Sequence, residues 1–201
     1  MSQYNAPPST RERIVVVAAR LIQRQGYVGT GIKQIATEAQ ATLGSVYHFF
    51  PGGKETLAVA ALQHGGKEFT WLLEDALTPE GDPAAAIEAC AVQLAVGLRE
   101  SGWIDGCPLL TAAALETLGT DSEIQRVCGE VLRGWEDVVA KKLLTCGFAE
   151  TDAREVAVTV ISTLEGAEVT AQVSRSEEPL RMAGRQLARL VRTYETSPAQ
   201  A

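Results

Sequence analysis

The sequence predicts an all-α protein, and three observations support this prediction. Apolar residues recur at helical spacing along nearly the whole chain, as in Ile14, Ala18 and Leu21. Signals that start helices precede several of these runs, such as Ser9 with Glu12, which have the spacing of a capping box. No segment shows the strict alternation of apolar and polar residues that is typical of a half-buried strand.

Charge is distributed unevenly between the two ends of the chain. The 201 residues carry a net charge of −7, and 46% of them are hydrophobic, which is enough for one large core or two modest ones. Residues 1–57 contain six basic and three acidic side chains and so carry +3, which leaves −10 for the remainder. A basic head on an acidic body can bind phosphate at one end while the other end repels it.

Cysteine spacing and the lengths of apolar runs indicate the compartment. The four cysteines are 17, 21 and 18 residues apart, without a CxxC pair or a neighbouring pair of histidines. This spacing argues against a zinc site and against a secreted disulfide framework. The longest early apolar run, Ile14 to Ala19, has six residues, which is too short for a signal peptide or a membrane span. We therefore expect a reduced cytoplasmic protein without a metal, a cofactor or a membrane partner.

The first part of the chain is predicted to contain a tail and four helices. Residues 1–8 should be disordered, and the first helix should end at Gly26, a residue type that suits a C-terminal cap. A long helix is expected from about residue 54 to 77, and the glycines at 65 and 66 in its middle predict a bend or fraying. Between these helices lie two short ones, whose apolar faces are formed by Ile32, Ile35, Ala36 and Ala39 and by Val46, Phe49 and Phe50.

The next helix has a clear start. Asp82 and Pro83 are of the types preferred at the N-cap and the first helical position, so a helix should run from there to about Arg99. Residues 101–107 are expected to form a loop, and a short helix should follow near 108–118.

Three longer segments complete the predicted organisation. Thr120 with Glu123 has capping-box spacing and predicts a helix to about residue 145, closed by Gly147. Two further helices are expected, at 152–172 and 178–195. A disordered tail should follow at 196–201.

The stretch from Gly31 to Lys54 predicts a helix-turn-helix, in which the second of two short helices enters the major groove of DNA. Ala36 is the small residue needed where the two helices cross. Thr42 is placed to cap the second helix and to leave backbone N–H groups at its start for phosphate or base acceptors. The outer face of that helix should be formed by Thr42, Leu43, Gly44, Ser45, Tyr47 and His48. The alternative is a surface helical hairpin of an all-helical domain, with Tyr47 and Phe49 as core aromatics.

From Arg13 to Leu57 the chain resembles the DNA-binding head of the TetR family of bacterial repressors. The matching residues are AARLI (18–22), GY (26–27), Thr30, IA (35–36), GSVYHFF (44–50) and KETL (54–57). The segments FPGGKE (50–55) and DGCP (105–108) are similar to the LmrA/YxaF-type subgroup of that family. The sequence departs from the family at Gln40, where a turn glycine is usual. It departs again at Leu43, where a polar residue such as lysine is common, although a leucine there could contact a thymine methyl group.

The resemblance implies both a domain organisation and a function. It implies a helix-turn-helix DNA-binding domain at 9–55, joined by the long helix to a helical effector-binding and dimerisation domain at 56–195. A homodimer would bind a palindromic double-stranded DNA operator as a repressor, and a small apolar or aromatic effector would release it. The candidate DNA-binding residues are Thr30, Lys33, Thr42, Leu43, Gly44, Ser45, Tyr47, His48 and Lys54.

Candidate residues of the body come from helix faces and from aromatic side chains. The apolar faces of the last two helices could form a dimer interface or pack inside one protomer; the candidates are Val160, Leu164, Ala167, Leu187 and Leu190. An effector pocket could be lined by Trp71, Trp103, Cys107, Leu110 and Trp135, although each of these could equally be an ordinary core residue. The last helix also has an arginine stripe, which we expect to be solvated or salt-bridged rather than a second DNA site: Arg181, Arg185, Arg189 and Arg192.

Two other functions would depend on isolated residues. Cys107, in a loop before Pro108, could make the chain a thiol-based redox-sensing regulator. The acidic side chains Glu116, Glu165 and Glu168 could serve a helical enzyme, but no histidine, metal-ligand spacing or nucleophile motif accompanies them. We therefore predict a regulator and not an enzyme.

Overall fold

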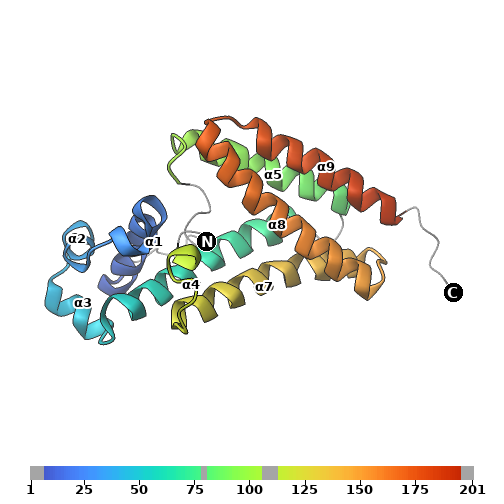
Figure 1. The fold of residues 1–201 in the computed structure, drawn as a ribbon. Coiled ribbons are helices and arrows are strands. Elements are labelled where there is room, and N and C mark those ends of the chain that lie inside the picture. Colours follow the sequence, from blue (N-terminus) through green and yellow to red (C-terminus); the bar gives the residue numbers. More distant parts are fainter. Residues whose placement is uncertain (1–6, 78–80, 106–112, 196–201) are drawn as a thin grey trace, which may run out of the picture. The chain divides into compact units, whose positions relative to one another are not determined.

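The computed structural model describes residues 7–77, 81–105 and 113–195, and its regular structure in these ranges is entirely helical (Figure 1). This confirms the predicted all-α class. None of the helices in the described ranges is long and apolar enough to cross a membrane. The helices are α1 (Thr10–Gly29), α2 (Ile32–Glu38), α3 (Leu43–Phe49), α4 (Gly53–Ala76), α5 (Pro83–Glu100), α7 (Glu123–Thr145), α8 (Glu150–Ser174) and α9 (Glu178–Glu195).

Several predicted helix ends are confirmed by their capping hydrogen bonds. The backbone N–H of Ser9 donates to Oε2 of Glu12 at 2.7 Å and the N–H of Glu12 donates to Oγ of Ser9 at 3.2 Å, which together form the capping box of α1. Gly26 interrupts the helical backbone of α1 with a φ of 79°, and one further turn follows it. Asp82 caps α5 by accepting a hydrogen bond from the backbone N–H of Ala84 at 3.0 Å.

One local prediction is wrong. Thr120 does not cap α7, because its hydroxyl donates to the carbonyl of Thr117 at 2.6 Å; Ser122 accepts the hydrogen bond from the N–H of Gln125 instead. Both residue types favour the cap, so the sequence could not distinguish them. The glycines at 65 and 66 lie inside a single helix, α4, and the bend or fraying expected there stays a prediction.

Contacts divide the chain into two compact units, and the division falls inside α4 and inside α7. The first unit comprises 1–65 and 109–128, and the second comprises 66–108 and 129–201. In the first unit, α1, α2 and α3 contact one another pairwise (Figure 1). They enclose a core that includes Ile14, Ala18, Ile22, Ile35, Ala36, Val46 and Phe50.

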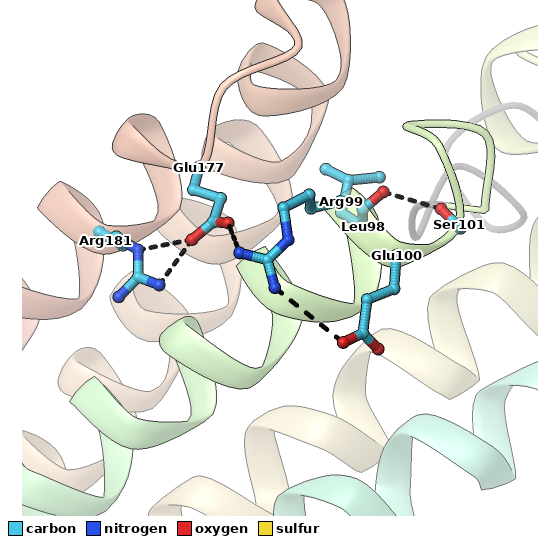
Figure 2. A network of polar contacts seen from close by, with 6 residues as sticks. All are labelled: Leu98, Arg99, Glu100, Ser101, Glu177 and Arg181. Carbon is cyan, nitrogen blue, oxygen red and sulfur yellow. Dashed lines mark hydrogen bonds and ion pairs between the residues drawn. The ribbon is translucent and has the colours of Figure 1, made fainter.

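In the second unit, α5 and α9 lie side by side and α8 contacts both (Figure 1). Gly184 on α9 permits the close approach, because a Cβ there would lie 2.7 Å from the Cβ of Ala91 on α5. Figure 2 shows a polar clamp between the same two elements: Glu177 accepts hydrogen bonds from Nη1 of Arg99 at 2.6 Å and from Nε of Arg181 at 2.7 Å. The packing of α5 and α9 is thus fixed by apolar contact and by a charged cluster.

Candidate nucleic-acid interface

Helix α3 exposes one face and buries the other. Oγ1 of Thr42 accepts a hydrogen bond from the backbone N–H of Ser45 at 3.0 Å, so Thr42 caps the helix as predicted. Val46 is 0% exposed and Phe50 is 1% exposed, and they attach the helix to the core of the first unit. Ser45 is half-buried, and the exposed positions are Thr42, Leu43, Gly44, Tyr47, His48 and Phe49. The residues expected to face DNA therefore lie together on the surface.

The turn between α2 and α3 adopts a glycine-like conformation without a glycine. Gln40 has a φ of 51°, in the left-handed region. The N–H of Ala41 donates to the carbonyl of Ala36 at 2.9 Å, and Nε of Arg13 on α1 donates to the carbonyl of Ala39 at 3.3 Å. These hydrogen bonds hold the turn in the shape for which the family uses glycine, and Gln40 takes the strained backbone position.

A chain of polar side chains links α1 to α2 along the surface of the head. Arg20 pairs with Glu38 at 2.8 Å, Glu38 also accepts from Nε2 of Gln34 at 3.0 Å, and Oε1 of Gln34 accepts from Nε2 of Gln25 at 2.8 Å. Exposed ion pairs and amide contacts contribute little stability singly. They connect α1 to α2, on which the exposed Lys33 lies.

Lys54, at the start of α4, is anchored to the end of α1. Its Nζ donates to the carbonyl of Val28 at 3.0 Å and lies 4.6 Å from the centre of the Tyr27 ring. Burial lowers the pKa of Lys54, and the negative charge of Glu116 acts in the opposite direction.

Arg11 is a further cation of the head, which sequence reasoning did not single out. Its guanidinium lies 5.4 Å from the centre of the Phe50 ring, at the C-terminal end of α3. Only the folded structure places the start of α1 beside this ring, since the two residues are far apart in sequence.

Two residues of the head are not where the sequence predicted. Thr30 is 1% exposed and its hydroxyl donates to the carbonyl of Gly26 at 2.6 Å, so its side chain lies inside the unit and does not offer a surface contact to DNA. Phe49 was expected on the apolar face of α3, but it is 37% exposed and meets the ring of His48 edge-on at 5.1 Å. Val46 and Phe50 are enough to fill the core beneath α3.

The predicted pocket residues that the structure describes differ in how deeply they are buried. Trp71 on α4 is 62% exposed, so it does not line an enclosed site within this chain. Trp135 is buried: its Nε1 donates to the carbonyl of Gly66 at 3.0 Å and its ring contacts Phe69 edge-on at 4.5 Å. Trp103 is half-buried in the turn after α5. Cys107 and Leu110 lie outside the described residues.

Three of the predicted interface residues belong to the protomer's own core. Val160, Leu164 and Leu187 are 1%, 2% and 3% exposed, because the apolar faces of α8 and α9 pack against each other and against α5. Within the single chain, these three side chains therefore pack in the core. Ala167 and Leu190 are half-buried.

Neither the cysteines nor the acidic residues form a reactive centre among the described residues. Burial raises the pKa of the Cys90 thiol to about 12 and that of the Cys128 thiol to about 11, which makes both poor nucleophiles. Within the ranges that the structure describes, no group of three His, Cys, Asp or Glu side chains could hold a metal ion. Glu116 belongs to the first unit, whereas Glu165 and the buried Glu168 belong to the second.

The arginine stripe of α9 is largely neutralised. Arg181 pairs with Glu177, Arg185 pairs with Glu178 at 2.7 Å, and Nη2 of Arg192 lies 3.8 Å from Asp82. This agrees with the expected salt-bridged stripe and argues against a second DNA site on α9.

Comparison with known proteins connects both units to transcriptional regulators. A family model described as "Bacterial regulatory proteins, tetR family" matches residues 14–61. Another, described as "Transcriptional regulator LmrA/YxaF-like, C-terminal domain", matches residues 83–186. Among individual relatives, the HTH-type transcriptional regulator YxaF of Bacillus subtilis (strain 168) is 36% identical over 183 residues, which cover 91% of this chain and 95% of YxaF.

Known structures share the same fold. The regulatory protein TetR from Rhodobacter sphaeroides superposes with a TM-score of 0.79 at 22% identity, over 90% of this chain and 97% of its own. The transcriptional regulator FadR from Bacillus subtilis, whose crystal structure is a complex with stearoyl-CoA, superposes with a TM-score of 0.67 at 16% identity, over 89% of this chain and 96% of its own.

Proposed function

Because the chain belongs to the TetR family of bacterial transcriptional regulators, in its LmrA/YxaF-like group, we propose that it represses transcription by binding a palindromic operator as a homodimer until a small-molecule effector releases it. Membership makes it a DNA-binding regulator rather than an enzyme. We assign DNA binding to residues 9–55, and effector binding and dimerisation to residues 56–195. The observation that supports operator binding most strongly is the exposed face of α3 around Tyr47, beneath which Val46 and Phe50 are buried.

We assign different roles to the candidate DNA-binding residues of the head. Lys33, Lys54 and His48 would contact phosphates, which position the protein without reading sequence. Ser45 and Tyr47 would bond base edges or phosphates, and Leu43, 39% exposed, would pack on a thymine methyl group. Two such helices in a symmetric dimer would enter successive major grooves about 34–36 Å apart.

Selection of bound duplexes from a random pool tests this assignment. We expect an inverted repeat to be enriched, and we expect Tyr47→Ala and Lys54→Ala to weaken binding to it while the protein stays folded. Lys67→Ala is the matched control, because it removes the same charge from an exposed position of α4 in the second unit. Affinities must be compared at one salt concentration, since each lost phosphate contact reduces the salt slope by about one. Normal operator affinity in Tyr47→Ala and Lys54→Ala would contradict the assignment.

We propose that the homodimer forms through the exposed face of α8. Val158, Val169 and Val173 are 47%, 40% and 83% exposed, and all lie on the side of α8 opposite to its buried residues. Ser162 and Gly166 lie on the same face and would allow a second helix to approach closely. Val169→Arg should yield monomers in sedimentation and lose operator binding. Leu144→Arg places the same charge on an exposed apolar position of α7 and should leave the dimer intact.

We propose that the second unit binds the effector. FadR, which shares this fold, was crystallised in complex with stearoyl-CoA, and the buried residues of this unit are mostly apolar, which supports an apolar or aromatic effector. Release requires that the effector bind the DNA-incompetent conformation more tightly, and a tenfold preference is worth about 1.4 kcal/mol. A thermal-shift screen of flat apolar compounds should find molecules that raise the unfolding midpoint and also displace a labelled operator. Compounds that stabilise the protein without displacing DNA would contradict this part of the proposal.

A further inference from the structure

Three segments of the first unit meet at one residue, Val28. It lies in the single helical turn that follows the interruption of α1 at Gly26. Its N–H donates to Oε2 of Glu116 at 2.8 Å, and its carbonyl accepts from Nζ of Lys54 at 3.0 Å. Both backbone polar groups of Val28 are thus held by side chains of opposite charge, from positions 88 and 26 residues away.

The approach of Glu116 depends on Gly26. A Cβ at Gly26 would lie 2.3 Å from Oε1 of Glu116, and the φ of 79° there also disfavours any other residue. The glycine therefore allows the turn at Tyr27 and Val28 and leaves space for the carboxylate. The ring of Tyr27 then lies against the Lys54 ammonium, 4.6 Å from its centre.

The Lys54 ammonium is held at this junction but keeps hydrogen-bond donors available for another partner. An ammonium has three donors, of which the Val28 carbonyl takes one. The remaining donors can bond a phosphate oxygen, so one group can bind the end of α1 and the DNA backbone together. The position of Val28 then determines where the ammonium meets the phosphate.

We propose that Glu116 is a positioning residue of the DNA-binding head. By holding the N–H of Val28 it fixes the carbonyl to which Lys54 is anchored, and so it orients the Lys54 ammonium toward a phosphate. The inference rests on the proposed function of the head. It adds to the DNA-binding machinery a residue far outside the helix-turn-helix, which itself touches no DNA.

Operator affinity, measured in the wild-type background and in a Lys54→Ala background, tests the proposal. Glu116→Ala removes the acceptor and should weaken binding about threefold to tenfold, the usual worth of a single hydrogen bond. Glu116→Gln keeps an acceptor oxygen and should bind like the wild type. Glu116→Asp keeps the charge but shortens the reach, so it should resemble Glu116→Ala and replaces it if that variant fails to fold.

The second background is Lys54→Ala. If Glu116 acts through Lys54, Glu116→Ala should have no further effect on affinity there, whereas a merely structural role would weaken binding equally in both backgrounds. Asp121→Ala is the charge control, because Asp121 is an exposed acid of the same unit to which the described structure gives no hydrogen bond or ion pair. It should leave operator affinity unchanged.

Each other outcome overturns the proposal in a recognisable way. Unchanged or tighter binding by both Glu116→Ala and Glu116→Asp, or an equal loss in the Lys54→Ala background, would reject the positioning role alone. Failure of the wild type to select any duplex would instead reject the proposed function, and this inference with it.

Discussion

The indole N–H of Trp135 donates a hydrogen bond to the carbonyl oxygen of Gly66 over 3.0 Å, so α7 rests directly on the backbone of α4. Such contact is possible only where the facing position has no side chain. A Cβ on Gly66 would lie 2.7 Å from Cγ1 of Val131, one turn before Trp135. Gly66 is therefore a packing position of the second unit.

We expect Gly66→Ala to destabilise the protein. Overpacking against Val131 should cost about 1–3 kcal/mol, which outweighs the gain of about 1 kcal/mol that alanine brings to a helix interior. The difference is measurable as a lower midpoint in urea unfolding. Gly97→Ala is the control, since Gly97 is an exposed position inside α5 and its Cβ would meet nothing within 4 Å. Gly97→Ala should stabilise the protein. If Gly66→Ala stabilised it as well, α4 and α7 would not be in close contact at Gly66.

Gln40→Gly should stabilise the head. A non-glycine residue in the left-handed region costs about 1–2 kcal/mol, and Gln40 has a φ of 51°. Glycine removes that cost but loses more conformational entropy on folding, so the net gain should be roughly 0.5–1 kcal/mol. Gln40→Ala keeps the strain and serves as the comparison in the same unfolding assay. A glycine variant no more stable than the alanine variant would mean that the turn is not strained at this position.

The helix-turn-helix could be predicted because its signals are local. Thr42, three residues before Ser45, marks the start of α3, and the spacing of Val46 and Phe50 shows which face is buried. The turn position where the family usually has glycine could also be located, although this chain has Gln40 there. These features depend on residues within one or two turns of each other, where sequence spacing corresponds directly to geometry.

The remaining features depend on partners that sequence spacing does not reveal. The apolar side of Val160 and Leu164 is evident from periodicity, but periodicity does not tell whether the partner is another helix of the same chain or of a second copy. The contact between Glu116 and Val28 joins residues 88 positions apart and has no sequence signature. Thr30 lies among residues that match the family, and only its burial shows that its side chain is committed to the interior.

Cys90 and Cys128 should be unreactive in the native protein. Only the thiolate attacks alkylating reagents, and burial raises the pKa of these thiols to about 12 and about 11. Alkylation followed by peptide mapping should label the exposed Cys146 in native protein, and Cys90 and Cys128 only after denaturation. Native labelling of Cys90 at the rate of Cys146 would show that the region between α5 and α8 opens readily.

The clamp at Glu177 should make part of the stability depend on pH. The hydrogen bond from Arg181 is the main reason that the pKa of Glu177 lies below its usual value of 4.5, and the charge of Arg99 adds to the effect (Figure 2). A group whose pKa is depressed in the native state contributes stability that is complete above its unfolded pKa. That contribution is lost as the pH falls through the native pKa.

Glu177→Gln tests that dependence. The variant should be less stable than the wild type at neutral pH, and the gap between their urea midpoints should narrow as the pH falls below 4.5. Glu100→Gln is the control, because the Glu100 side chain is 70% exposed and its carboxylate makes only a weak contact with Arg99, at 4.0 Å, at the edge of the same cluster. It should leave the urea midpoint unchanged both at neutral pH and below pH 4.5. A gap for Glu177→Gln that stays constant with pH would mean that the variant disturbs packing between α5 and α9 instead of removing a charge-assisted contact.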